Sequence, residues 1–160
     1  MGARRGRVNG ETHVPQRLNY KALAPEAHKA MLALSAVVAG SGLEAALCQL
    51  VKLRVSQING CAYCCWLHAE DLRALGEIPA RLDCLAAWRE APYYTARERA
   101  ALDWAEAVTQ IGHGHAPDEV YRVVLAQFSE AHVVALTYLV AEINAWNRLA
   151  IPFRAEPPKA

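Results

Sequence analysis

From Pro25 onward, apolar residues recur at intervals of three and four positions along nearly the whole chain. This spacing predicts amphipathic helices, and glycine, proline and capping residues separate one helical segment from the next. No segment alternates apolar and polar residues with a period of two, and no unit repeats at a fixed spacing. The pattern therefore predicts an all-α fold of about seven helices.

The first two predicted helices are separated by a glycine-rich break. The first runs over Pro25–Ala39, because proline suits the first position of a helix, and Gly40 stops it. We expect the second to begin with a capping box, in which Ser41 and Glu44 each satisfy an amide at the helix start. We expect this second helix to end near Ile58.

The third predicted helix carries most of the cysteines. Asn59 is a suitable N-cap for a helix over Cys61–Leu75, which Gly76 terminates. A shorter helix is expected over Pro79–Glu90. The pattern thus places several thiols on one helix near its N-terminus.

Three further helix starts are predicted in the second half of the chain. They consist of residue types that begin or cap helices, namely Thr95 with Glu98, Pro117 with Asp118 and Glu119, and Ser129. We expect the first of these helices to end at Gly112 and the last to end before Pro152, which lacks the amide hydrogen that a helix needs.

Composition agrees with one folded domain. The chain has 160 residues, of which 54% are apolar and 21% charged, so we expect a flexible arm over residues 1–20 and a single helical domain over 21–160. A net charge of +1 argues against nucleic acid or an acidic membrane as partner. Without an apolar run of about 20 residues or a secretory leader pattern, the chain is expected in the cytoplasm.

The chemistry is concentrated in a C-x-x-C pair. Cys61 and Cys64 are three positions apart on the first turn of a helix, and His68 lies only ~20° around the helix from Cys61. A helix N-terminus stabilises a thiolate, and an imidazole one turn away can move a proton. Two neighbouring thiols can form a sulfenic acid and then a disulfide. The spacing therefore favours redox chemistry.

Other interpretations of the cysteines compete with this one. A thioredoxin-type site would need strands, and haem attachment would need histidine where Cys65 stands. Zinc bound by Cys61, Cys64 and His68, with Cys65 or Cys84 as a fourth ligand, is a fairer rival, as are buried structural cysteines. No second ligand pair follows, so we expect no bound metal.

Three segments resemble a known family. The run SQINGCAYCCWLH at residues 56–68, within the longer match over 50–76, and the segments at 87–95 and 143–151 are similar to the carboxymuconolactone decarboxylase-like family. They most resemble its alkylhydroperoxidase AhpD-like branch. The resemblance implies an all-helical homotrimer or homohexamer with thiol peroxidase activity and no cofactor, reduced by a dithiol partner such as a lipoyl protein or a thioredoxin-like protein.

The resemblance also assigns roles to residues. It implies that Cys64 attacks peroxide, that Cys61 resolves the sulfenic acid, and that His68 belongs to a proton relay. Asn147, near the C-terminus, follows the family pattern and is expected at a contact between subunits.

This chain departs from the AhpD-like pattern at two positions. The pattern has a glutamate twelve residues before the first cysteine, where this chain has Gln49, and a histidine in some members where it has Tyr63. An amide cannot accept a proton, so slow peroxide turnover is expected, reduced by ~10²–10⁴-fold. Cys65 is either an alternative resolving thiol or a small buried residue. A muconolactone-type decarboxylase and a non-catalytic redox-sensing or zinc-holding scaffold are the alternative functions.

Overall fold

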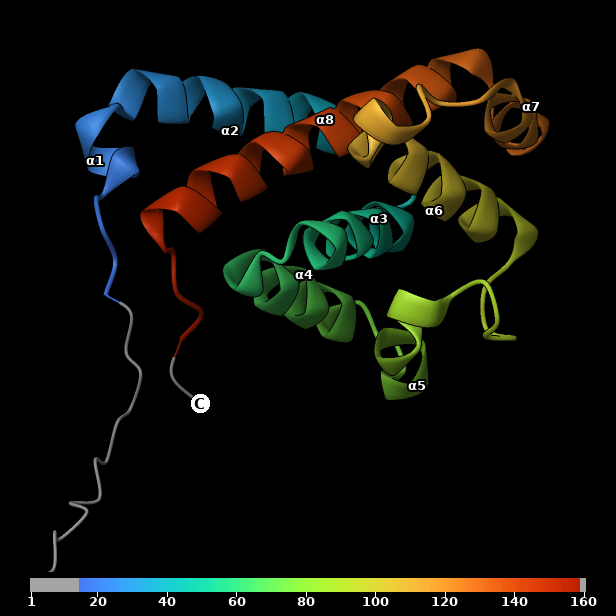
Figure 1. The fold of residues 1–160 in the computed structure, drawn as a ribbon, viewed down its shortest axis with the longest axis horizontal. Helices are drawn as coiled ribbons and strands as arrows, with labels where there is room; N and C mark the ends of the chain where they lie inside the picture. The colour runs from blue at the N-terminus through green and yellow to red at the C-terminus, as the bar shows by residue number, and fades with distance from the viewer. Residues whose placement is uncertain (1–14, 159–160) are drawn as a thin grey trace, which may run out of the picture.

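The computed structural model describes residues 15–158 and is all-helical within them, which confirms the predicted fold class (Figure 1). Its helices are α1 (Tyr20–Leu23), α2 (Pro25–Ala39), α3 (Ala45–Asn59), α4 (Ala62–Ala74), α5 (Pro79–Asp83), α6 (Ala96–Thr109), α7 (Asp118–Gln127) and α8 (Glu130–Phe153), with short 3₁₀ helices at Leu85–Ala87 and Ile111–His113. No single helix among the described residues is long and apolar enough to span a membrane; α7 and α8 pass that test of length and composition only as a joined pair bent by 118°.

Helix α3 lies at the centre and packs against α4, α6 and α8, while α2 runs along α8 (Figure 1). The buried side chains of α3 divide between two apolar clusters. Val51 and Val55 are fully buried in the cluster shared with α6 and α8, whereas Leu50 and Leu53 face the cluster around α4 and α5. Each such buried side chain stabilises the fold by ~1.5–3 kcal/mol. The central helix therefore fixes α4 relative to α8.

The two predicted capping boxes have different outcomes. The box at Thr95 and Glu98 is confirmed, with both side-chain-to-backbone bonds present. The box at Ser41 and Glu44 is wrong, because Glu44 is itself the N-cap and its side chain makes no capping bond. Its carboxylate instead accepts hydrogen bonds from Arg97 at 3.0 and 3.2 Å. A charge-assisted bidentate pair is stronger than a neutral cap bond and wins the competition.

The boundary between α3 and α4 also differs from the prediction. Asn59 is the last residue of α3 and caps nothing; its amide donates to Asn144 and Asn147. Gly60, in the left-handed region with a φ of 71°, ends α3, and Cys61 is the N-cap of α4. One glycine thus turns the chain directly from one helix into the next.

Three other helix ends shift by a few residues. The predicted helix over Pro79–Glu90 splits into α5 and the first 3₁₀ helix, and α6 ends before Gly112, which lies in the second 3₁₀ helix. Helix α8 passes through Pro152 and ends at Phe153. Proline is tolerated there because it lies in the last turn.

The predicted arm over residues 1–20 falls mostly outside the described residues. Of its described part, Arg17 donates from its backbone N–H to the Phe153 carbonyl and from its guanidinium to the Pro152 carbonyl, both at 3.1 Å. Tyr20 is the first residue of α1 and stacks on Phe153. This part of the chain lies against the end of α8.

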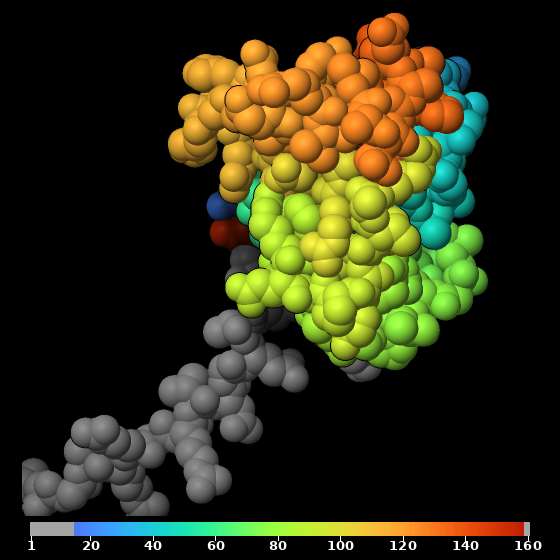
Figure 2. All heavy atoms as spheres, turned by 90° about the vertical axis from the view of Figure 1, so that its right-hand side faces the viewer, coloured from blue at the N-terminus to red at the C-terminus, as the bar shows by residue number. Residues whose placement is uncertain are grey.

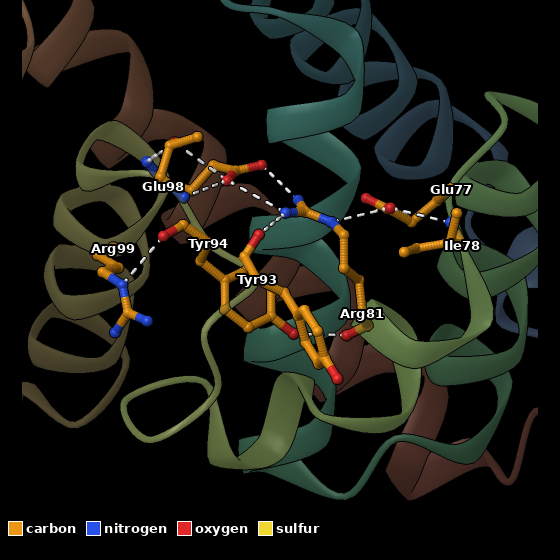
Figure 3. Close-up of polar contacts among 8 residues, drawn as sticks. Glu77, Ile78, Arg81, Tyr93, Tyr94, Glu98 and Arg99 are labelled. Carbon is orange, nitrogen blue, oxygen red and sulfur yellow. Dashed lines mark hydrogen bonds and ion pairs between the residues drawn. The ribbon is translucent and has the colours of Figure 1, made fainter.

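Arg81 on α5 joins the segment before α6 to the rest of the protein (Figure 3). Its guanidinium contacts Glu77, Glu98 and the Tyr93 carbonyl, and the Tyr94 hydroxyl donates to the Arg81 carbonyl. In the side view of Figure 2, α7 (orange) lies above the segment leading from α5 into α6 (green to yellow). The Arg81 cluster therefore joins α5 to the loop before α6 and to the first turn of α6.

Candidate functional site

The turn between α3 and α4 places both predicted thiols at the start of a helix. The Cys61 N–H donates to the Ser56 carbonyl at 3.0 Å, which closes the turn. The Cys61 sulfur in turn accepts a hydrogen bond from the Cys64 backbone N–H at 3.4 Å. Only 1% of Cys61 and 4% of Cys64 is exposed. The predicted pair is therefore buried, with one sulfur acting as the helix cap.

The two thiols have opposite acidities. A hydrogen bond from the Cys64 thiol, with help from the Cys64 backbone N–H and the Asn147 amide, outweighs burial and lowers the pKa of Cys61 to about 7. The same thiol–thiol bond, burial and the Cys61 charge raise the pKa of Cys64. The pair therefore titrates as a unit that loses its first proton near neutral pH, while the second proton stays between the two sulfurs. Burial and the Cys61 charge raise the pKa of Cys65 to about 11, so this third thiol is not activated.

Asn147 on α8 is a site residue that the sequence analysis assigned to a subunit contact. It is fully buried, its Nδ2 donates to the Ser56 hydroxyl at 3.2 Å, and its Oδ1 accepts from Asn59 at 2.8 Å. The nearby amide also lowers the pKa of both cysteine sulfurs. The signal in the sequence was a polar residue within an apolar stripe, seven residues after Val140 and three before Ala150.

His68 and Gln49, the two relay positions named by the family resemblance, are in contact in the structure. His68 Nδ1 lies 2.8 Å from Gln49 Oε1. An amide oxygen only accepts, so Nδ1 carries the hydrogen and Nε2 is the free acceptor. Burial, together with the positive charge of Lys52, lowers the pKa of His68 to about 3. The imidazole is neutral at physiological pH and is a weak base.

A cavity of about 360 Å³ opens beside one of the two thiols. Residues of α1, α2, α3, α4 and α8 form its walls. The polar or aromatic side chains among them include Cys64, His68, Gln49, Tyr63, Ser35, Lys52, Asp71, Glu142 and Trp146. Cys61 and Cys65 are not among the lining residues. A small molecule in this cavity therefore contacts Cys64 and not Cys61. Among residues 15–158, no group of three or more His, Cys, Asp or Glu side chains is placed to hold a metal ion.

Glu142 on α8 is the second residue that the sequence analysis missed. Only 1% of it is exposed, and its Oε1 accepts hydrogen bonds from the Ser35 hydroxyl, from Trp146 Nε1 at 3.1 Å and from Lys52 Nζ at 3.4 Å. Its Oε2 is buried without a hydrogen-bond partner in the described part of the chain. A glutamate interrupting the apolar run of the last helix was the available signal.

The family model of the carboxymuconolactone decarboxylase family matches residues 25–107, which include the turn, the cysteine pair and His68. The chain belongs to this family. The uncharacterized protein YdfG of Bacillus subtilis (strain 168) is similar to this chain, with 39% identity over 136 residues that cover 85% of this chain and 92% of YdfG.

Solved structures share the fold. A protein of unknown function from Agrobacterium tumefaciens, suggested to be an antioxidant defence protein AhpD, is 42% identical with a TM-score of 0.89, covering 91% of this chain and 100% of that one. The debrominase Bmp8 is 17% identical with a TM-score of 0.76, covering 86% of this chain and 74% of that one. That likeness shows the fold alone. The family fold thus supports more than one chemistry, and the site has to decide between them.

Proposed function

We propose that this protein is a thiol peroxidase and disulfide oxidoreductase of the AhpD type, which reduces an organic hydroperoxide at Cys64 and closes a disulfide with Cys61. One observation carries the proposal. The first proton leaves the pair near neutral pH, and of the two residues Cys64 lines the cavity whereas Cys61 does not. A nucleophile thus faces the substrate space while its partner is kept from it.

The cycle follows from this geometry. In the reduced pair Cys61 carries the charge and Cys64 the proton. As peroxide binds, the Cys64 thiol passes its proton to the Cys61 sulfur and reacts as the thiolate. That thiolate attacks the terminal oxygen of the peroxide and becomes a sulfenate, while the peroxide proton passes to the other oxygen, which leaves as an alcohol. The Cys61 thiol gives its proton to the sulfenate oxygen and attacks the Cys64 sulfur, so that a disulfide forms and hydroxide leaves, to be protonated by solvent.

An external dithiol closes the cycle. A lipoyl protein or a thioredoxin-like protein reduces the disulfide by exchange, and its own dithiol becomes oxidised. We further propose a homotrimer or homohexamer as the working form. Exposed apolar side chains on α2 and α8 support this assembly, with Val37, Val134 and Tyr138 each more than half exposed.

A thiol count tests the proposed cycle. One equivalent of an organic hydroperoxide is added to the reduced protein, and free thiols are counted after denaturation. We expect the count to fall from five to three in the wild type, and to stay unchanged at matched times in Cys64→Ser. Cys65→Ser is the matched control and still loses two thiols. A wild type that keeps all its thiols, or a Cys64→Ser variant that loses two at the wild-type rate, contradicts the proposal.

A further inference from the structure

A buried carboxylate shares the cavity with the reactive thiol and has no task in the cycle as described. Glu142 lies on α8, next to Ile143, which also lines the cavity. Three donors hold its Oε1, from Ser35, Lys52 and Trp146, whereas its Oε2 has no hydrogen-bond partner in residues 15–158. One oxygen is fixed in position and the other is free to accept.

A buried carboxylate oxygen without a hydrogen-bond donor destabilises the folded protein unless a ligand supplies that donor. Removing a carboxylate from water is unfavourable, and hydrogen bonds and a nearby cation offset this only in part. Lys52 Nζ is 3.4 Å from Oε1, the oxygen that already has hydrogen-bond donors. A ligand that donates a hydrogen bond in the cavity would satisfy Oε2. A hydroperoxide, R–O–O–H, carries one such donor.

We propose that Glu142 is the acid–base residue of this site, and that its Oε2 accepts the O–H of the bound hydroperoxide and passes that proton to the leaving oxygen. This inference rests on the proposed peroxidase function. It assigns to α8 the proton transfer that Gln49 on α3 cannot perform, since an amide does not take up a proton.

The step balances in atoms and electrons. The Cys64 thiolate attacks the terminal oxygen, a sulfur–oxygen bond forms and the oxygen–oxygen bond breaks, with its electron pair going to the inner oxygen. The proton of the terminal oxygen moves to Glu142 and from there to the inner oxygen, which leaves as the alcohol. Sulfur is oxidised to the sulfenate, the peroxide is reduced, and Glu142 ends as the carboxylate with which it began.

The other polar side chains of the cavity are less suited to this transfer. The Nδ1 of His68 is occupied by Gln49, and the imidazole is neutral. Asp71 lies at the cavity margin with 42% of its side chain exposed, so water solvates its carboxylate. Lys52 donates to Glu142. Glu142 is the one buried carboxylate among the described residues that line the cavity.

The test compares two reagents on the same thiol. Glu142→Gln keeps the size of the side chain and an oxygen for Ser35 and Trp146, but removes the acid–base group. With an organic hydroperoxide such as tert-butyl hydroperoxide, whose alkoxide needs a proton, we expect thiol oxidation to slow by ~100-fold. With an aromatic disulfide reagent such as dithionitrobenzoate, whose thiolate leaves without a proton, we expect the wild-type rate. Glu130→Gln, an exposed change on the same helix, is the matched control and leaves both rates unchanged.

Three outcomes would contradict the inference. A Glu142→Gln variant that reacts with hydroperoxide at the wild-type rate removes Glu142 from the mechanism. Equal slowing with both reagents assigns it a structural role only. A wild type that reacts with the disulfide but not with hydroperoxide overturns the proposed function itself, and is thereby distinct from the first two.

Discussion

The acidity of a single sulfur depends here on donors from separate parts of the chain. The Cys64 thiol and N–H come from the same turn as Cys61, but the Asn147 amide comes from α8. Each donor stabilises the thiolate more than the thiol, and together they outweigh the cost of burying the charge. Reactivity at this residue is therefore shared between local and distant contacts.

The first prediction at the scale of single residues concerns the titration of Cys61. Because its pKa is lowered from 9.0 to about 7, the reduced protein should gain thiolate absorbance as the pH rises through about 7. Cys61→Ser should lose this transition, and Cys84→Ser should keep it. A wild-type midpoint near 9, or a midpoint near 7 that persists in Cys61→Ser, would show that the pair is not organised as described.

Asn147 supplies the second prediction. Asn147→Leu removes the amide from both sulfurs and leaves Ser56 and Asn59 with fewer partners. We expect the thiol midpoint to rise and the free energy of unfolding to fall by ~1–3 kcal/mol. The thiol midpoint comes from ultraviolet absorbance against pH, and the stability from urea denaturation.

Asn144→Leu is the matched control for this variant. Asn144 accepts from Asn59 and donates to Thr109, but it has no hydrogen bond to either sulfur. It should therefore lose stability without a change in the thiol midpoint. Equal midpoints in the two variants would assign Asn147 to stability alone.

At the scale of elements, the turn between α3 and α4 decides where the cysteine pair lies. Gly60 N–H bonds to the Gln57 carbonyl and Cys61 N–H to the Ser56 carbonyl, so the last turn of α3 leads straight into the first turn of α4. A left-handed residue makes this direct connection. The thiols consequently lie where unpaired helix amides are available.

The turn predicts that alanine substitutions at two glycines have different effects on stability. Gly60→Ala places a side chain at a φ of 71° and should lower the free energy of unfolding by ~1–2 kcal/mol. Gly40→Ala is the matched control, because the φ of Gly40 is −83° and its nearest contacts for a Cβ are ordinary at 3.6 Å. It should be neutral or slightly stabilising. Urea denaturation measures both, and equal losses would mean that the left-handed geometry is not the cause.

At the scale of the whole molecule, stability and chemistry occupy different regions. The cavity lies where α2, α3, α4 and α8 meet, and the Arg81 cluster holds α5 to the start of α6 (Figures 1 and 3). Changes in one region should leave the other intact. This separation lets the cluster be tested for stability without altering the thiols.

The Arg81 cluster predicts a pH-dependent stability. Burial alone would raise the pKa of Glu98, but hydrogen bonds from Arg81 and Thr95 lower it below its ordinary value of 4.5. A lowered folded-state pKa stabilises the protein above pH 4.5, and this contribution disappears as the pH falls through the lower folded value. The stability conferred by Arg81 should follow the same course.

Arg81→Met tests this by urea denaturation at two pH values. We expect a loss of ~1–3 kcal/mol at pH 7 and a smaller difference from wild type below about pH 4. Arg73→Met removes an exposed pair with Glu70 and should change stability by less than ~0.5 kcal/mol. A loss in Arg81→Met that stays the same at both pH values would mean that lost packing, not the ion pair, is responsible.

The local features of this protein could be predicted from its sequence. Helical periodicity gave the fold class, the capping box at Thr95 was confirmed, and the spacing of Cys61, Cys64 and His68 placed them on one helix. These features depend on residues within one or two turns of each other, which a pattern along the chain records directly. The resemblance singled out Gln49 and His68 as relay positions, and the hydrogen bond between them was found only in the structure.

Tertiary packing alone decided which side chains complete the site. Asn147 lies 91 residues from its partner Ser56, and Glu142 lies 107 residues from Ser35. A helical pattern marks such residues only as polar positions on an apolar face, because it does not say which helix packs opposite. The partner helix determines whether a buried amide meets a thiol and whether a carboxylate faces a cavity. The sequence therefore determined the cysteine pair and its helix, while the packing of α8 against α3 and α4 determined the groups that surround the pair.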